Sequence, residues 1–91
     1  MAQTDPTVAY TRHARQKFEV LKRHGLEVTT AAVELTVVSP EKLEPYSEGR
    51  FIAQRGIDDR HVLRVVYREE GDTRVIITFY PGRRDRYESQ L

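Results

Sequence analysis

The hydrophobic period of this chain changes near residue 50, and this change limits the fold more than any other feature. Before residue 40, apolar residues recur at the spacing of a helix face. After residue 50, apolar and polar residues alternate as they do in half-buried strands. Helices followed by strands predict an α+β fold, in which the two kinds of element are segregated along the chain.

Two helices are expected in the first part of the chain. The first spans Thr11 to His24 and is followed by Gly25, the residue type that most readily takes the left-handed conformation at a helix end. Its apolar residues share one face: Ala14, Phe18 and Leu21. The second runs from Thr30 to Val38, with Thr29 as its N-cap. Pro40 ends it, because proline disfavours helical geometry at the preceding residue.

Three strands are expected in the second part: Arg50 to Arg55, His61 to Arg68 and Thr73 to Tyr80. Their connections are short, which predicts an antiparallel meander. Residues 40–49 contain two prolines and three glutamates and are predicted to be an irregular connection. Thr7 to Tyr10 is rich enough in β-formers to add a fourth strand. We therefore expect two N-terminal helices packed on one face of a three- to four-stranded antiparallel sheet.

The turn around Gly71 decides which side chains share a face of that sheet. A two-residue turn would place Arg64 beside Phe79, whereas a three-residue turn pairs odd positions with odd ones. The second arrangement separates apolar from polar residues, so we prefer it. The helices then cover an odd face: Leu63, Val65, Tyr67, Val75, Ile77 and Phe79. The outer, even face presents Arg64, Val66, Ile76, Thr78 and Tyr80.

A chain of 91 residues predicts one domain over 1–91, with flexible ends at 1–6 and 89–91. It has no cysteine, which excludes disulfides, thiolate nucleophiles and zinc–thiolate sites. Two of its three histidines, His13 and His24, share a helix but lie about 16 Å apart along its axis. We therefore expect no metal and no cofactor, and a site at the surface.

The net charge of +1 hides an uneven distribution. Residues 10–25 carry five basic and one acidic side chain, residues 26–50 two and five, and residues 51–91 eight and seven. Twelve of the 15 basic residues are arginine, which suits bidentate contact with phosphate. A genome rich in G and C would produce the same bias, so arginine content alone does not decide between these explanations.

Localisation follows from what the sequence lacks. Its longest apolar run, Val75 to Ile77, is far shorter than the ~18 residues of a membrane span. The first residues carry no charged-then-apolar signal pattern. We expect a cytoplasmic protein with no membrane partner.

Arginine and tyrosine alternate on the outer face and in the tail that follows it. The face offers Arg64, Thr78 and Tyr80, and residues 83–87 continue with Arg-Arg-Asp-Arg-Tyr. Such a surface holds phosphates while bases stack on its rings. With a histidine or tyrosine to move protons, it would also cleave RNA without a metal. The alternative is that the tyrosines cap the core and the arginines pair with Asp85 and Glu88.

Five motifs, in this order, resemble a family of small bacterial domains of unknown function. They are Tyr10-Thr11-x-His13-Ala14, His24-Gly25, Leu63-Arg64-Val65-Val66-Tyr67, Val75-Ile76-Ile77-Thr78-Phe79-Tyr80-Pro81 and Arg84-x-Arg86-Tyr87. The family is grouped with the RelE/ParE-like toxin superfamily and is similar to the BrnT toxins. The resemblance covers residues 8–88 and implies two helices on one face of a small antiparallel sheet.

The resemblance also implies a function. RelE-like proteins cut mRNA, often on the ribosome, ParE-like proteins poison DNA gyrase, and a small cognate antitoxin neutralises both. Six residues match the polar positions that recur in the family: His13, Arg64, Tyr80, Arg84, Arg86 and Tyr87. The hypothesis is a toxin-like component of a bacterial type II toxin–antitoxin pair, acting as a metal-independent mRNA endoribonuclease.

In that hypothesis, Arg64 and Arg84 would hold the scissile phosphate, and His13 would be the general acid or base. Tyr80 or Tyr87 would stack a base or relay a proton. Four residues are expected to contact RNA: Thr78, Arg83, Arg86 and Tyr87.

Two other functions stay open. A domain that binds RNA without cleaving it would keep Arg64 and the basic tail. A protein-interaction domain would use an edge strand, or the apolar residues of the outer face, to bind a partner helix or to form a homodimer. Those apolar residues are Val62, Val66 and Ile76.

Overall fold

The computed structural model of the chain describes residues 6–88. It has an α+β fold whose elements are β1 (Thr7–Tyr10), α1 (Arg12–Arg23), α2 (Thr30–Val38), β2 (Lys42–Pro45), β3 (Arg50–Gly56), β4 (His61–Glu70), β5 (Thr73–Arg83) and α3 (Arg84–Tyr87). The flexible ends expected from the sequence lie outside the described residues, apart from Pro6, which is half-buried. Within residues 6–88, no helix has the length and apolar character that a bilayer span requires.

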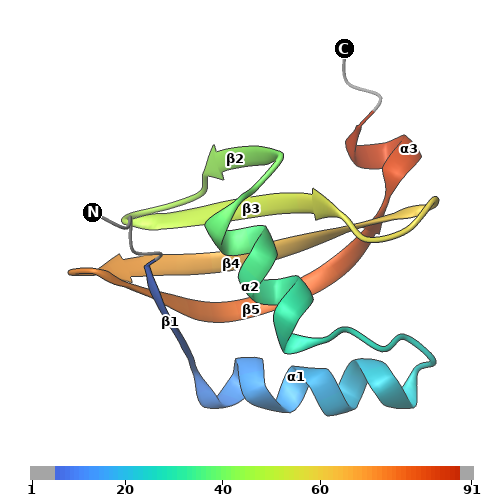
Figure 1. Cartoon of the computed structure of the whole chain (residues 1–91), viewed down its shortest axis with the longest axis horizontal. Helices are drawn as coiled ribbons and strands as arrows, with labels where there is room; N and C mark the ends of the chain where they lie inside the picture. The colour runs from blue at the N-terminus through green and yellow to red at the C-terminus, as the bar shows by residue number, and fades with distance from the viewer. Residues whose placement is uncertain (1–5, 89–91) are drawn as a thin grey trace, which may run out of the picture.

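The strands form one sheet in the order β1-β5-β4-β3-β2 (Figure 1). β2 to β5 are antiparallel neighbours, but β1 runs parallel to β5, with Thr7 opposite Thr73 and Tyr10 opposite Ile76. The expectation of a purely antiparallel sheet of three or four strands is therefore wrong. β1 occupies the edge of β5 that β4 leaves free, and the chain then turns directly into α1. Nothing in four β-prone residues reveals that direction.

The acidic connection also contains a strand that the sequence did not predict. β2 pairs with β3, with Leu43 opposite Ala53. Backbone hydrogen bonds continue past both ends of the pairing, from Glu41 N to Gln54 O at 2.9 Å and from Tyr46 N to Arg50 O at 3.0 Å. β2 is an edge strand, where proline is tolerated, so the prolines that indicated an irregular segment do not prevent pairing.

Both predicted helices are confirmed with their caps. The Thr11 hydroxyl accepts the N–H of Ala14, and His24 ends α1. Gly25 has φ 85°, and Leu26 N donates to Leu21 O at 2.9 Å, which is the 6→1 bond of a Schellman motif. In α2 the Thr29 hydroxyl caps the N-terminus in the same way.

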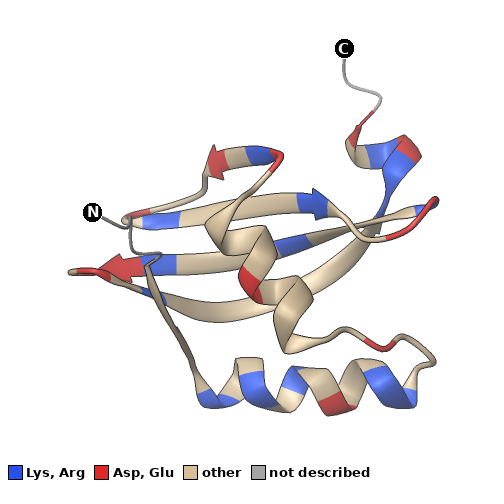
Figure 2. Cartoon of the chain, in the orientation of Figure 1, with Lys and Arg blue, Asp and Glu red and all other residues tan. Residues whose placement is uncertain are grey.

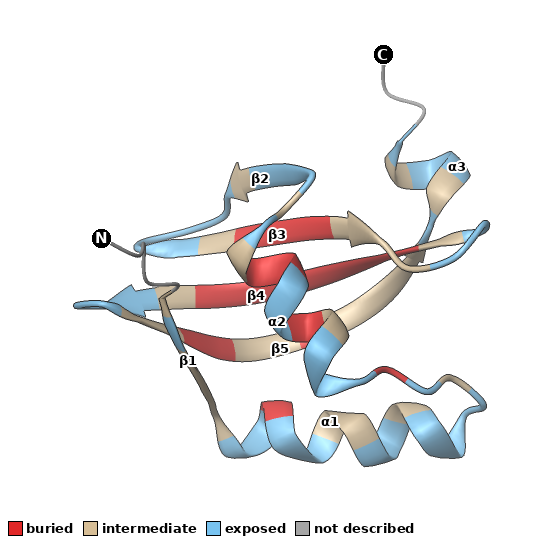
Figure 3. Ribbon diagram, in the orientation of Figure 1, coloured by how far each residue is buried: buried red, intermediate tan, exposed pale blue. Residues whose placement is uncertain are grey.

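The helices cover one face of the sheet unequally. α2 crosses the face above β3 and β4, whereas α1 lies along the β5 side (Figure 1). The Phe18 ring of α1 is 4.6 Å from the Phe79 ring of β5, centroid to centroid. The hydrophobic core between helices and sheet consists of Ala14, Val28, Val33, Val37, Ala53, Leu63, Val65, Tyr67, Ile76 and Phe79. Figure 3 shows the buried residues concentrated in the middle of β3, β4 and β5.

The turn between β4 and β5 differs from the expected one. Glu70 pairs with Thr73, so the turn has two residues, and the predicted three-residue loop is wrong. The register then shifts, because Tyr67 pairs with Ile76 while Val66 pairs with Thr78. Ile77 is therefore the extra residue of a β-bulge, which exchanges the faces of β5.

The bulge explains which residues reach the core. Ahead of it, Ile76 enters the core in place of the expected Val75 and Ile77. Beyond it, Phe79 pairs with Val65, as the preferred parity required. The polar residues of β4 and β5 consequently share the opposite face even though the turn is shorter than expected.

Candidate functional site

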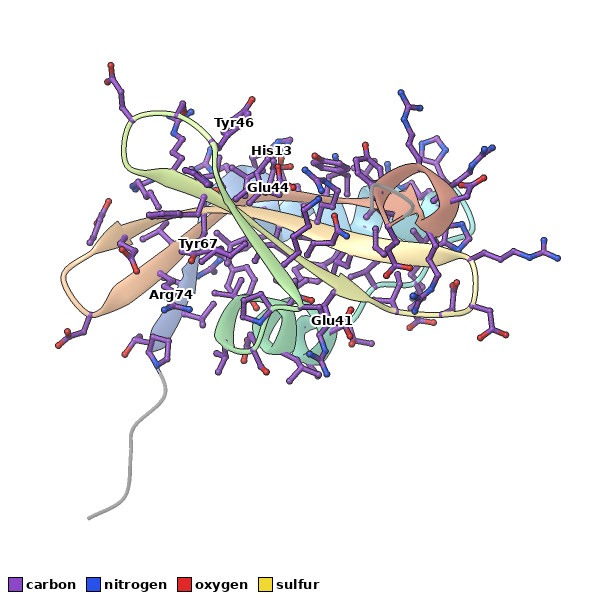
Figure 4. The ribbon with its side chains drawn as sticks, turned by 90° about the horizontal axis from the view of Figure 1, so that it is seen from above. His13, Glu41, Glu44, Tyr46, Tyr67 and Arg74 are labelled. Carbon is purple, nitrogen blue, oxygen red and sulfur yellow. The ribbon has the colours of Figure 1, made fainter. Side chains whose placement is uncertain are left out.

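The side of the sheet that α2 does not cover is called the open face here. Cross-strand pairing places eight residues of β2 to β5 on it: Glu44, Ile52, Gln54, Val62, Arg64, Val66, Thr78 and Tyr80. Figure 4 views the sheet from above, with α2 on one side and the labelled His13 and Glu44 on the other. The apolar patch expected for partner binding is absent here, because Val62, Val66 and Ile76 are all buried.

A polar row crosses the middle of the open face. Gln54 of β3 lies opposite Arg64 of β4, which lies opposite Tyr80 of β5. Arg64 Nε donates to Tyr80 Oη at 3.1 Å, and Arg64 Nη1 donates to Gln54 Oε1. Nη1 also lies 3.4 Å from Glu44 Oε2 on β2. Side chains from the three other antiparallel strands, β2, β3 and β5, thus fix the guanidinium in one orientation.

Arg64 is only 5% exposed, so its charge is costly unless polar groups surround it. Burial alone lowers the pKa of Arg64, but the Tyr80 hydrogen bond and the Glu44 carboxylate outweigh it and raise the pKa above its usual value. Among residues 6–88, hydrogen bonds engage Nε and Nη1 only, and every fully buried side-chain nitrogen has a partner. Nη2 therefore has no hydrogen-bond partner among these residues and is not fully buried.

The imidazole of His13 extends this row along β5. His13 is exposed in the first turn of α1, and its Nε2 lies 3.1 Å from Thr78 Oγ1. Thr78 and Tyr80 are two residues apart on the same face, which corresponds to about 7 Å. His13, Thr78, Tyr80 and Arg64 thus follow one another across the open face, but His13 bonds to Thr78 rather than to Arg64.

The aromatic ring of Tyr87 closes one end of the open face. α3 folds back so that this ring lies 4.4 Å from Arg64 Cζ, in cation–π geometry. The ring also sits on the backbone of Gly82, where an added Cβ would lie 2.4 Å from Tyr87 Cε2. Glycine at position 82 therefore allows Tyr87 to reach Arg64. Gly82 is the sequence feature that allows the contact, but its role can be recognised only once the fold is known.

The arginines of the tail differ in their partners. Arg84 Nε donates to Asp58 O at 2.6 Å, and its Nη1 bonds Glu88 at 2.8 and 2.9 Å. Glu88 raises the pKa of Arg84 above its usual value. Arg83 pairs with Asp85 at 3.2 Å, and both of these side chains are largely exposed. The structure does not bring Arg84 to Arg64, and the pairing with Asp85 and Glu88 that the alternative interpretation expected is present. Figure 2 shows these charges at α3 and the basic residues along α1.

Three residues of this region were not among the predicted site residues. Gln54 and Glu44 hold Arg64, and His61 forms a pair with Asp58 in the β3–β4 loop. Gln54 could have been found as the one polar residue inside an apolar strand. Glu44 had no such signal, because β2 itself was not predicted.

The arrangement brings a fixed, largely buried cation, two half-buried phenol rings and an exposed imidazole to the open face. Within the described residues, no three His, Cys, Asp or Glu side chains are grouped to hold a metal ion. A phosphate could contact Arg64 Nη2, with Tyr80 on β5 and His13, which reaches β5 from α1 at Thr78, to exchange protons. No protein-family model, no curated protein and no solved structure matches this chain.

Proposed function

We propose that this chain is a RelE-like toxin component of a bacterial type II toxin–antitoxin pair, and that it cleaves mRNA in the cytoplasm without a metal. The observation that carries the proposal is Arg64, a largely buried guanidinium whose Nη2 has no hydrogen-bond partner among residues 6–88. It lies between Leu63 and Val65, where Tyr80, Gln54 and Glu44 compensate its charge, and Nη2 is the atom that remains to contact a phosphate. The proposed partners are single-stranded RNA, on the ribosome, and a cognate antitoxin.

Two features support the RelE-like part of this proposal. α1 and α2 are followed by an antiparallel meander of β3, β4 and β5, which is the part of the expected arrangement that supports the resemblance. The polar residues that the resemblance picks out on β4 and β5, Arg64 and Tyr80, are also hydrogen-bonded to each other. β1 is the expected fourth strand but runs parallel to β5, and β2 adds a fifth strand beside β3.

The cleavage step can be written with these residues. The 2′-oxygen loses its proton to the His13 imidazole and forms a bond to phosphorus, while the bond from phosphorus to the 5′-oxygen breaks. Tyr80 Oη accepts from Arg64 Nε, so its own proton is free to pass to the leaving 5′-oxygen, and water then restores it. Arg64 stabilises the charge on the phosphorane. Because Arg84 is held by Asp58 and Glu88, this scheme assigns the phosphate contact to Arg64 alone.

The test uses the purified chain, a defined single-stranded RNA and excess chelator. We expect cleavage products with 2′,3′-cyclic phosphate ends, and slowed growth when the chain is induced without its genomic neighbour. Tyr80→Phe keeps the ring and removes only the hydroxyl, so it should reduce the rate while leaving the fold intact by circular dichroism. His13→Gln should do the same. Arg23→Gln, a change on the exposed surface of α1, is the control. Wild-type protein that neither cleaves RNA nor slows growth would contradict the endoribonuclease.

A second function is favoured by one specific observation. Arg64 already has Tyr80, Gln54 and Glu44 as partners, which is the state expected of a structural arginine at an RNA-binding surface. A domain of this kind binds RNA in a salt-dependent way without cutting it. His13→Gln would then leave both RNA affinity and RNA length unchanged.

A further inference from the structure

The loop between β3 and β4 holds a histidine in a fixed orientation. Asp58 Oδ1 accepts the backbone N–H groups of Arg60 and His61, each at 2.7 Å. His61 Nδ1 lies 3.0 Å from the same oxygen. The N–H of Ile57 donates to His61 O at 3.0 Å and closes the loop. The loop therefore fixes both the backbone and the ring of His61.

The contact with Asp58 also decides which ring nitrogen is free. The Arg60 backbone N–H, together with His61, holds the pKa of Asp58 below its usual value, so its carboxylate accepts only. Nδ1 must then be the donor, and Nε2 is the nitrogen directed away from the carboxylate. Among residues 6–88, the ring of His61 has no other hydrogen-bond partner than Asp58.

The His61 side chain borders a groove of about 430 Å³, which is large enough for a nucleotide. Its lining is His61, Pro81, Gly82, Arg83, Arg86 and Tyr87. None of these six residues is acidic, although Asp58 and Asp85 lie nearby. The exposed pair of Arg83 with Asp85 is weak, because solvent screens both charges, so a phosphate can replace the carboxylate.

The groove adjoins the site at Arg64. Tyr87 belongs to both, since its ring faces the Arg64 guanidinium and also lines the groove. On β4, His61 precedes Arg64 by three residues, about 10 Å along the strand, and this odd separation directs the two side chains to opposite faces of the sheet. Tyr87 lies at the end of the sheet and contacts both sites, so one strand of nucleic acid can pass from Arg64, over Tyr87 and around this end, to His61.

We propose that this groove is a phosphate subsite for single-stranded RNA, in which His61 Nε2, Arg83 and Arg86 bind a phosphate on the same strand as the one at Arg64. The subsite rests on the RNA binding of the proposed function and not on cleavage. Asp58 is a positioning residue that holds the imidazole toward the groove. His61 lies too far along the sheet from His13 for the two to act on one phosphodiester.

The experiment measures the anisotropy of labelled hexauridine RNA on the full chain over a series of salt concentrations. A single-stranded RNA contact contributes about 0.7 to the slope of log Kd against log salt. We expect Arg86→Gln to lower the slope by about 0.7, and His61→Gln and Asp58→Asn to weaken binding several-fold. Arg23→Gln on α1 is the matched charge control and should leave the affinity for RNA unchanged. Thermal melting of each variant separates a binding loss from unfolding.

Three results would overturn the subsite. If hexauridine binds wild-type protein but the slope and affinity are unchanged in both Arg86→Gln and His61→Gln, the subsite is wrong while the proposed function stands. If uridine monophosphate competes as well per phosphate as the hexamer, the groove binds free nucleotides and not a strand. If wild-type protein does not bind hexauridine at any salt concentration, the subsite and the proposed function both fail.

Discussion

The two faces of the central sheet are buried to a similar depth but by different chemistry. On the helix-covered face, Leu63, Val65 and Phe79 belong to an apolar core with α1 and α2. On the open face, Gln54 and Arg64 are 4% and 5% exposed and are joined by hydrogen bonds. Apolar packing tolerates small adjustments, whereas a hydrogen-bonded row requires every member in place. One face therefore supplies stability, and the other positions a charge.

Truncating the apolar face should have the largest effect on stability. Phe79→Ala removes a fully buried ring that contacts Phe18, and we expect a loss of about 3–5 kcal/mol in the free energy of unfolding. Urea denaturation measures this loss in the free energy of unfolding. Phe79→Leu keeps most of the volume and should lose clearly less. Equal losses in the two variants would show that packing does not dominate this face.

Disrupting the polar row should lower the free energy of unfolding less than Phe79→Ala does, but it should abolish RNA binding. Arg64→Met leaves Gln54 and Tyr80 without their partner, at about 1–3 kcal/mol. Adding Gln54→Leu removes the Gln54 amide that Arg64→Met leaves without a partner, so the double variant should regain part of the stability in urea denaturation. It should not regain RNA binding. Recovery of RNA binding together with stability would mean that Arg64 acts only through the fold.

The N-cap of α1 lies where the two faces meet and should have a smaller effect. The Thr11 hydroxyl caps Ala14 N and donates to Ile77 O at 3.1 Å, next to His13. Thr11→Ala should cost about 1 kcal/mol in urea denaturation and also disturb His13. Thr29→Ala, the cap of α2, is the control, because it removes a cap of the same kind far from the open face. If Thr29→Ala reduces RNA binding as much as Thr11→Ala does, the cap has no specific link to the site.

Alkaline pH should produce the smallest loss of stability. The group responsible is Tyr10, which packs against the core on the helix-covered side. Burial, and then the hydrogen bond to Glu34, raise the pKa of Tyr10 above its usual value. The folded state thus favours the neutral phenol, and this stability is fully present below about pH 10, the unfolded pKa. It is lost as the pH rises above that value. Urea midpoints between pH 8 and pH 11 should fall less steeply in Tyr10→Phe; an unchanged pH dependence would contradict this.

Local patterns account for the elements that were predicted correctly. The N-caps Thr11 and Thr29, and Gly25 after α1, act within a few residues of the helix ends, so both helices could be predicted from the sequence. The strands β3, β4 and β5 begin at the expected residues because their alternation is local as well. The bulge at Ile77, the pairing of β2 and the direction of β1 depend on neighbours that are distant in sequence, and no local pattern encodes them.

The candidate site was predictable to the same extent. Arg64 and Tyr80 were expected on one face, but that expectation rested on a three-residue turn, whereas in the structure a two-residue turn and the bulge at Ile77 together place them on the same face. Their contacts with Gln54, Glu44 and Tyr87 depend on register and on the close approach at Gly82. These are tertiary features. The orientation of His61 by Asp58 is local in sequence, but its relevance appears only when α3 forms the groove beside it.

The parallel pairing of β1 with β5 determines when, during synthesis, the protein can finish folding. The Thr11 hydroxyl donates to Ile77 O, 66 residues later in the chain, so this edge closes only after nearly the whole chain has been synthesised. His13 follows β1 directly and cannot reach Thr78 before then. A nascent chain still attached to the ribosome therefore carries its arginines without the contact between His13 and Thr78. For a protein proposed to cut messenger RNA, translation of its own message would finish before the enzyme is assembled.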